Sequence, residues 1–185
     1  MKEKKTTEVS VSGAYRLIHP KLAVLLTCAD KEGNANIITL AWTMPVSMNP
    51  PLIAVSISPR RHSHKMIEET SEFVINVPTM EIVKETLFCG RKSGKNLDKF
   101  KETKLTPLPA KSVKVPIIKE CVAHLECKLY KQIPAGDHTL FIGEIQKAYA
   151  DEDLFSDEYN LAKAKLIFHV GGNRFTTAND NAVEP

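Results

Sequence analysis

The sequence lacks the features that mark a membrane or secreted protein. No stretch of the 185-residue chain approaches the roughly 18 consecutive apolar residues that a membrane-spanning helix needs. The N-terminus, MKEKKTTEVSVSG, is charged but leads into no apolar core with a small-residue cleavage site. We therefore expect a cytoplasmic, soluble protein with no membrane contact.

A large excess of basic residues is also missing. The 25 Lys and Arg residues and 22 Asp and Glu residues are mixed along the chain and leave a formal net charge of +3. Nucleic-acid-binding domains usually concentrate positive charge on one face, so we expect no nucleic-acid partner. The average contents of hydrophobic (43%) and charged (25%) residues indicate a globular chain. Its length fits one domain over residues 1–185, with loose tails at about 1–12 and 176–185.

Cysteine pairs and common catalytic motifs are absent as well. The four cysteines, Cys28, Cys89, Cys121 and Cys127, form no CxxC pair, so we expect reduced thiols and no metal site. No GxGxxG motif follows a strand-like run, and no phosphate-loop motif GxxxxGK followed by Ser or Thr is present, which excludes those two nucleotide-binding scaffolds. Nor is there a GxSxG motif to support a Ser-His-Asp hydrolase.

What the sequence does contain is a series of strand-like runs. Strands are predicted over 22–29, 36–42, 52–57, 73–77 and within 161–175, and a hairpin over 120–133 and 138–150 around the turn PAGD. Prolines in 43–51 predict an irregular link there. Helices are predicted over 62–72 and 79–90, the second closed by Gly90, and a short one inside a long surface excursion at 91–116. This order favours a closed or half-closed antiparallel β-barrel with peripheral helices.

The octapeptide SPRRHSHK, residues 58–65, leaves three alternatives open. It could hold a metal through its two histidines, form a solvated turn, or bind an anion. Anion binding is favoured because a strand ends and a helix begins here, so free N–H groups, hydroxyls and basic side chains converge. One phosphate group is the expected ligand, and Arg61 and His64 are expected to face water only.

Three further residues have two readings each. Trp42, the only tryptophan, lies where a strand breaks and is either a core residue or the wall of a site for a flat aromatic ligand. His138 follows the hairpin turn and is either a surface histidine or a contact for a second ligand. Cys89 is expected to be buried and inert rather than reactive.

Four segments together resemble a known family. They are HPKLAVLLTCADKEGNANIITLAWTMPVSMNPPLIAVSIS, SPRRHSHKMIEETSEFVINV, CGRKSGKNLDKF and GDHTLFIGEI. Their order resembles the flavin reductase-like family of FMN-binding split barrels, which includes flavoredoxins and archaeal-type ferric reductases. The resemblance spans roughly residues 15–175, and the N-x-x-T-x-x-W strand, S-x-x-P-P link and Arg-His-Ser loop are its most specific parts. It implies a mainly β, Greek-key antiparallel split β-barrel and a homodimer with one FMN per subunit near the dimer interface.

The resemblance also implies roles for individual residues. The phosphate loop of FMN would comprise Ser58, Arg60, His62, Ser63 and Lys65. The isoalloxazine ring would lie along Asn36, Thr39, Ala41, Trp42, Thr43 and Met44, with Lys99 and Phe175 closing over it. His138 resembles the histidine that reductases place near the nicotinamide, and it is the one expected catalytic residue.

The implied activity is hydride transfer from NADH or NADPH to FMN, with electrons passing on to free flavin, oxygen, ferric iron or an acceptor protein. The flavin carries the chemistry, so the protein needs no acid or base for the hydride step. A flavoredoxin-type electron carrier and an FMN-binding redox module remain open alternatives. No sequence feature distinguishes NADH from NADPH.

Overall fold

The computed structural model describes residues 4–179, so the outer ends of both expected tails lie outside the described residues. Its main sheet has seven strands, each antiparallel to its neighbours, in the order β3-β2-β6-β9-β10-β5-β4. Their bounds are β2 Val24–Ala29, β3 Ala35–Leu40, β4 Thr43–Met48, β5 Pro51–Ile57, β6 Glu72–Val77, β9 Ala123–Ala135 and β10 His138–Ala150.

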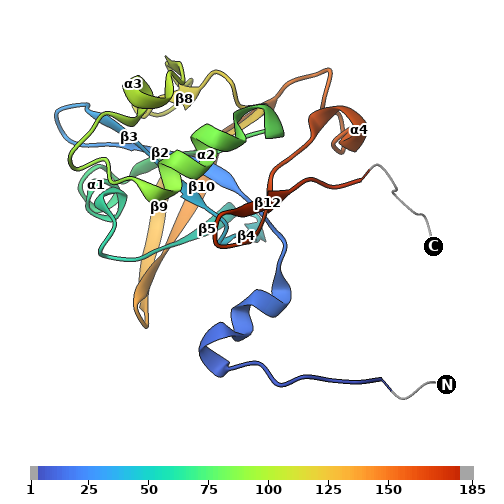
Figure 1. The fold of residues 1–185 in the computed structure, drawn as a ribbon. Helices are drawn as coiled ribbons and strands as arrows, with labels where there is room; N and C mark the ends of the chain where they lie inside the picture. The colour runs from blue at the N-terminus through green and yellow to red at the C-terminus, as the bar shows by residue number, and fades with distance from the viewer. Residues whose placement is uncertain (1–3, 180–185) are drawn as a thin grey trace.

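Helices and small strands surround the main sheet (Figure 1). The α-helices are α1 His62–Thr70, α2 Val83–Arg91, α3 Lys99–Thr103 and α4 Leu161–Ala164, and the 3-10 helices are η1 Val11–Ile18 and η2 Met80–Ile82. A three-stranded sheet pairs β1 Lys21–Leu22 with β11 Phe168–Gly171 and β12 Arg174–Thr176, and a two-stranded sheet pairs β7 Pro107–Leu108 with β8 Ile117–Ile118. No helix within residues 4–179 is long and apolar enough to cross a membrane.

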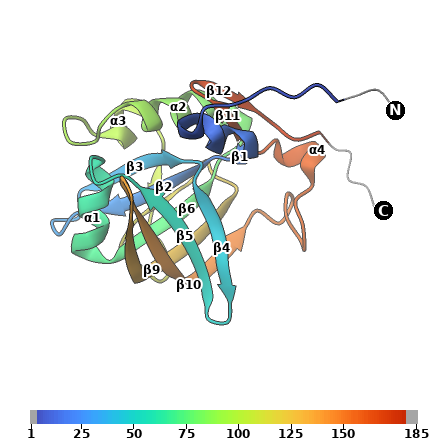
Figure 2. The ribbon, with the colours of Figure 1, turned by 90° about the horizontal axis from the view of Figure 1, so that it is seen from below.

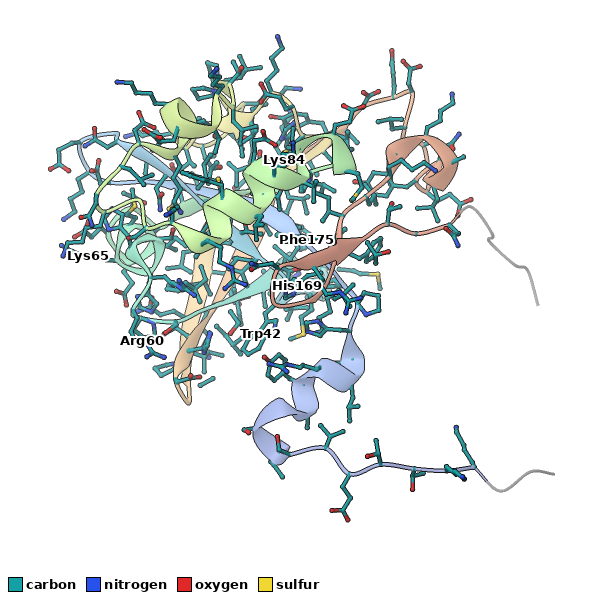
Figure 3. All side chains as sticks on the ribbon, viewed as in Figure 1. Trp42, Arg60, Lys65, Lys84, His169 and Phe175 are labelled. Carbon is teal, nitrogen blue, oxygen red and sulfur yellow. The ribbon has the colours of Figure 1, made fainter. Side chains whose placement is uncertain are left out.

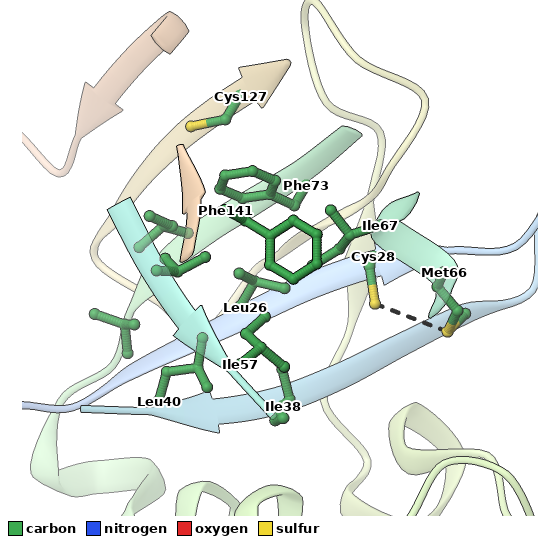
Figure 4. Close-up of a cluster of buried hydrophobic side chains, with 13 residues drawn as sticks. Leu26, Cys28, Ile38, Leu40, Ile57, Met66, Ile67, Phe73, Cys127 and Phe141 are labelled. Atoms are coloured by element: carbon green, nitrogen blue, oxygen red, sulfur yellow. Dashed lines mark hydrogen bonds between the residues drawn. The ribbon is translucent and has the colours of Figure 1, made fainter. Parts of the chain in front are cut away.

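The main sheet is rolled around an apolar core. Because alternate residues of a strand point to opposite faces, Val24, Leu26 and Cys28 of β2 point inward together. They meet inward-facing residues of β3, β5, β6, β9 and β10 in one cluster, which includes Phe73 and Phe141 (Figure 4). β3 and β5 lie near opposite edges of the sheet, so only a curled sheet brings their side chains together. The expected antiparallel split-barrel fold is confirmed.

Two helices, α1 and α2, pack against this barrel next to the candidate site. Met66 and Ile67 of α1 insert into the barrel core, which holds the first turn of α1 against the end of β5. On the outer face, Leu25 and Ile37 pack against Cys89 of α2 and its neighbours from α3. Apolar side chains on both faces explain why every residue of β2 is buried. Each fully buried Leu, Ile or Phe stabilises such packing by about 1.5–3 kcal/mol.

The link between residues 42 and 52 differs from the prediction. It was expected to be irregular, but β4 occupies it and pairs with β5. Pro45 is tolerated because β4 is an edge strand, where a missing N–H breaks no ladder on the free side, and the register shifts between Pro45 and Ser47. The prolines therefore mark the edge and the turn of a hairpin rather than the absence of a strand.

The chain near Gly90 also differs from the prediction, because α2 continues through Gly90 to Arg91. A side chain at Gly90 would place its Cβ 3.2 Å from the Cβ of Thr39, so glycine allows α2 to lie close to β3. The excursion at 91–116 contains the predicted short helix, but it is not wholly at the surface, since Lys99, Phe100 and Leu105 are buried. The long hairpin is confirmed, with Gly136 at a φ of 63° in its turn.

Candidate functional site

A cleft lies at the C-terminal parts of β3 and β5 and divides into two joined parts. The larger part has a volume of about 400 Å³, and the smaller one, about 70 Å³. Ile38, Arg61 and Gly90 line both parts, which makes them one continuous depression. Its walls come from β3, β5, the end of α2, η1 and the β11–β12 hairpin, segments that approach one another in Figure 2.

The smaller part lies at the N-terminus of α1. The residue at the N-cap position of this helix is Arg61, which makes no side-chain capping bond. The N–H groups of a first helical turn have no partner within the helix, and an N-cap Ser, Thr, Asp or Asn normally accepts from one of them. Arg60, Arg61 and Lys99 line the same pocket. Lys92 lines it too, and open N–H donors together with four cations make this part of the cleft selective for an anion.

Lys99 is the buried cation of the small pocket. Its residue is 3% exposed, and its Nζ donates to the carbonyl oxygens of Ile37 at 2.6 Å and Cys89 at 2.8 Å. Burial, opposed by nearby thiols and reinforced by Arg61, lowers the pKa of Lys99. An ammonium has three donors, so one remains for a ligand in the pocket.

Asn36 and Ser63 join the sheet to the helix at the same place. Asn36 Nδ2 donates to Ser63 Oγ at 2.8 Å, and both side chains are buried. Asn36 Oδ1 is buried with no hydrogen-bond partner among the described residues. A Cβ built on Gly94 would overlap this oxygen and lie 2.6 Å from Asn36 Cγ. The backbone at Gly94 therefore packs directly on the Asn36 amide, which only glycine permits.

The larger part of the cleft is lined by backbone and rings. Thr39 of β3 and Ala41, which follows β3, form one wall together with Ser58. The Oγ atom of Ser58 is buried without a hydrogen-bond partner among the described residues. Trp42 and Phe175, together with His169, gather at the centre of Figure 3. Trp42 is 39% exposed, so it lines the cleft rather than the barrel core.

His138 faces this cleft from the start of β10. Its ring centroid lies 5.0 Å from that of Trp42, and its Nδ1 lies 2.7 Å from Asp137 Oδ1. The hydrogen bond with His138 lowers the pKa of Asp137, so this carboxylate is ionised and accepts from Nδ1–H. The other ring nitrogen is then the one free to meet a ligand.

The structure brings most of the predicted site residues into one cleft. The larger part contains Thr39, Ala41, Trp42, Ser58, His138 and Phe175, and the smaller part contains Asn36, Arg60, His62, Ser63 and Lys99. It does not bring in Thr43, Met44 or Lys65. Thr43 and Met44 begin β4, where they pair with Val55 and Ala54 of β5, and Met44 is 56% exposed. The Lys65 side chain is 76% exposed and pairs with Glu69 at 3.3 Å on the outer face of α1.

Arg61 and His64, which were both expected to face only water, have other surroundings in the structure. Arg61 lines both parts of the cleft. His64 is buried, with Nε2 2.8 Å from Thr139 Oγ1 and Nδ1 3.2 Å from Glu68 Oε2. A helix turns its successive residues by about 100°, so neighbours in SPRRHSHK face different surroundings. All four cysteines are free and buried, and burial raises the pKa of Cys89 to about 11.

Sequence reasoning missed several residues of the cleft. They are Tyr15, Arg16, Gly90, Arg91, Lys92 and His169. The run GRK, residues 90–92, could have indicated basic side chains near the end of α2. No local sequence pattern predicts that η1 lies beside a hairpin formed by residues near the other end of the chain. Among the described residues that line either part, none is Asp or Glu. Residues 4–179 also contain no group of three or more His, Cys, Asp or Glu side chains placed to hold a metal.

Comparison with known proteins agrees with this arrangement. The flavin reductase like domain matches residues 16–174. The chain belongs to this family. An uncharacterized protein of Archaeoglobus fulgidus is 40% identical over 151 residues, which cover 81% of this chain and 85% of the relative.

Two solved flavoredoxins have the same fold as this member of the flavin reductase-like family. Flavoredoxin of Desulfovibrio vulgaris superposes with a TM-score of 0.86 at 29% identity, over 98% of this chain and 97% of that one. Flavoredoxin of Methanosarcina acetivorans superposes with a TM-score of 0.81 at 28% identity, over 100% of this chain and 95% of that one.

Proposed function

We propose that this protein is an FMN-dependent oxidoreductase that takes electrons from NADH or NADPH and passes them to a flavin, ferric iron, oxygen or protein acceptor. One observation carries the proposal: the uncapped N-terminus of α1 opens into a small cationic pocket that is continuous with a larger cleft lined by rings and backbone. A ligand with a phosphate at one end and a flat ring system at the other matches both parts.

The residues present fit FMN. Asn36 Oδ1 and Ser58 Oγ are buried polar atoms without partners among the described residues, and both line the cleft. Such atoms cost free energy unless a ligand satisfies them. Gly90 and Gly94 let the backbone lie close to the cleft, because a side chain at Gly90 would crowd Thr39 and one at Gly94 would overlap Asn36. Solved relatives in the family include an FMN-binding domain of a flavin reductase-like enzyme from Shewanella baltica.

In this proposal each region of the cleft has a distinct task. The first-turn N–H groups of α1, Arg60 and Lys99 bind the phosphate of FMN, which stands where an N-cap side chain would. Ser58 and the backbone of β3 orient the ring. When bound, FMN would supply the chemistry of hydride acceptance from the nicotinamide and electron transfer to an acceptor. Trp42 and His138 border the open side, where Asp137 holds His138 in one tautomer and so keeps a ring nitrogen directed at the incoming substrate.

The first experiment measures FMN binding by fluorescence titration of purified protein. Arg60→Ala should weaken FMN by about 1.5–3 kcal/mol, the contribution of a hydrogen bond to a charged group. Lys65→Ala is the matched control, because it removes the same charge from the same helix end but from an exposed, ion-paired side chain outside the cleft. Absence of FMN binding by the parent protein would contradict the proposal. An equal loss of FMN affinity in both variants would contradict the role of Arg60.

The second experiment separates an enzyme from a carrier. FMN-loaded protein is mixed without oxygen with NADH or NADPH, and flavin absorbance is followed by stopped flow. Bleaching on the timescale of turnover supports the reductase. A flavin that stays oxidised with both donors contradicts it and favours a flavoredoxin-type carrier.

A homodimer is part of the same proposal. β4 is an edge strand beside Trp42, and it exposes three large apolar side chains, with Met44 at 56%, Val46 at 44% and Met48 at 95%. Exposed apolar surface of this kind commonly marks an interface. Analytical ultracentrifugation should give a dimer for the parent and a shift toward monomer for Val46→Lys. A monomeric parent at micromolar concentration would contradict this arrangement.

A further inference from the structure

Five exposed basic side chains surround the openings of the cleft. Arg16 belongs to η1, Arg60 and Arg61 to the turn between β5 and α1, and Arg91 and Lys92 to the end of α2. The larger part of the cleft is lined by Arg16 and Arg91, the smaller part by Arg60 and Lys92, and both parts by Arg61. We call these five residues the basic rim. Three segments that are distant in the sequence supply it, so the fold gathers this charge at the cleft.

The basic rim carries an excess of positive charge. None of its members forms an ion pair with another residue in the range 4–179. Acidic side chains of the adjacent segments already have partners, since Glu68 and Glu69 pair within α1 and Asp137 pairs with His138. Because no Asp or Glu of the described chain lines either part of the cleft, the positive charge there is not balanced locally.

A bound FMN would leave most of this charge free. A phosphate monoester carries about two negative charges at neutral pH. In the proposed function, Arg60, the buried Lys99 and the N–H groups of α1 bind this phosphate. The other four members of the basic rim would remain, and they are spread over both openings of the cleft. One small ligand does not account for charge distributed in this way, whereas an extended acidic surface does.

The densest run of acidic residues lies elsewhere in the molecule. The loop between β10 and α4 contains DEDLFSDE, residues 151–158, and all five of its acidic residues are exposed. This loop lines neither part of the cleft. In Figures 1 and 2 it lies beside α4, on the side of the molecule away from α1. The net charge of +3 is therefore unevenly distributed, and this separation of charge would turn the cleft toward an acidic partner.

We propose that the basic rim is the docking surface for an electron-transfer protein with an acidic face, which accepts electrons from the flavin at the cleft. This inference rests on the proposed function, because bound FMN supplies the electrons. The reduced flavin, FMNH⁻, would give one electron to each of two acceptor molecules and return to FMN with release of one proton. Opposite charges speed such encounters by about 10- to 1,000-fold, and salt removes the gain. A nucleic acid would also be attracted, but it accepts no electrons.

The test uses two forms of one acceptor that differ mainly in charge. Native cytochrome c is basic, and succinylated cytochrome c carries carboxylates on its lysines around the same haem. FMN-loaded protein is separated from unbound flavin by gel filtration, reduced without oxygen by one equivalent of dithionite and mixed with either form. Because dithionite supplies the electrons, the result does not depend on activity with a nicotinamide. Stopped flow follows haem reduction per bound flavin at ionic strengths of about 0.01 M and about 0.1 M, where the screening length is about 30 Å and about 10 Å.

Succinylated cytochrome c should be reduced at least about tenfold faster than the native form at the lower ionic strength, and the difference should shrink at the higher one. Arg91→Glu and Lys92→Glu should each lower this advantage by about threefold, because each reverses one charge of the basic rim. Lys163→Glu is the matched control. It makes the same change of charge at an exposed residue of α4 that lines neither part of the cleft, so it should keep the advantage.

Three results would overturn the inference while FMN binding stands. They are equal rates with the two forms of cytochrome c, a faster rate with the native form, and an advantage that both variants of the basic rim retain in full. Protein that takes up no FMN contradicts the proposed function itself, on which the inference depends.

Discussion

Replacement of Gly94 by alanine tests whether the Asn36 amide shapes the small pocket. The added methyl group would overlap Asn36 Oδ1 and come within 2.6 Å of its Cγ, so the amide must move. The φ angle at Gly94 lies outside the left-handed region, and backbone strain therefore contributes nothing. The cost arises from the hydrogen bond between Asn36 Nδ2 and Ser63 Oγ, which is 2.8 Å long and is lost when the amide moves.

The size of the effect follows from that bond. A buried hydrogen bond contributes about 0.5–1.5 kcal/mol, and a buried group left without its partner costs about 1–3 kcal/mol. Gly94→Ala should therefore lower the free energy of unfolding by about 1–3 kcal/mol. Because Ser63 lies in the first turn of α1 and lines the pocket, FMN affinity should fall by about tenfold, which corresponds to about 1.4 kcal/mol.

A double-mutant cycle with Asn36→Ser isolates the contact. Serine ends one atom after Cβ and leaves room for the new methyl group, so Gly94→Ala should cost little in that background. Urea unfolding and FMN titration of the four proteins give the coupling energy, which should exceed about 1 kcal/mol for residues in contact. If the alanine costs as much beside serine as beside asparagine, the overlap with the Asn36 amide is not its cause.

Three more changes test other parts of the molecule. Lys99→Met should weaken FMN by about 1.5–3 kcal/mol in a fluorescence titration, because it removes a buried donor from the small pocket proposed to bind the phosphate; unchanged affinity would place the phosphate elsewhere. Burial lowers the pKa of His124 to about 4. Below its ordinary pKa of about 6.5, the imidazole is therefore protonated in the unfolded chain but stays neutral in the folded chain until the pH approaches 4. Stability in urea should fall by up to about 3 kcal/mol from pH 6.5 to 4, and His124→Gln should flatten this slope. Phe141→Ala should lower the free energy of unfolding by about 3–5 kcal/mol, and a smaller loss would mean that the barrel core collapses around the cavity.

Local patterns sufficed where the chemistry is local. Residues 58–65 contain a strand end, a helix start and basic side chains in succession, and the structure places this segment at the small pocket. What the pattern could not supply is which face of α1 each residue takes. Lys65 and His64 are neighbours of Ser63, yet one faces solvent and the other packs against Phe141 inside the barrel.

Tertiary context overrode local signals at β4 and Gly90. Prolines disfavour a strand only when the missing N–H is needed, and the edge position of β4 could not be known before the strand order was known. Gly90 resembles a helix terminator in the sequence, but its lack of a side chain serves the approach of α2 to Thr39 of β3. The local structure at each of these residues is determined by a neighbour that is distant along the chain.

The two ends of the cleft impose a direction on any ligand that fills it. The N-terminus of α1 and Lys99 attract an anion at the small end, and they lie among buried groups where charge interactions are least screened. The other end is bordered by rings, is open to solvent at Trp42 and is wide enough for a flat ring system, with Arg16 and Arg91 among its lining residues. A phosphorylated flavin bound in the reverse sense would leave the open donors of α1 unsatisfied. Under the proposed function, the uncapped N-terminus of α1 and the buried Lys99 therefore favour the phosphate at the small end and the ring system at the mouth, where a second substrate could reach it.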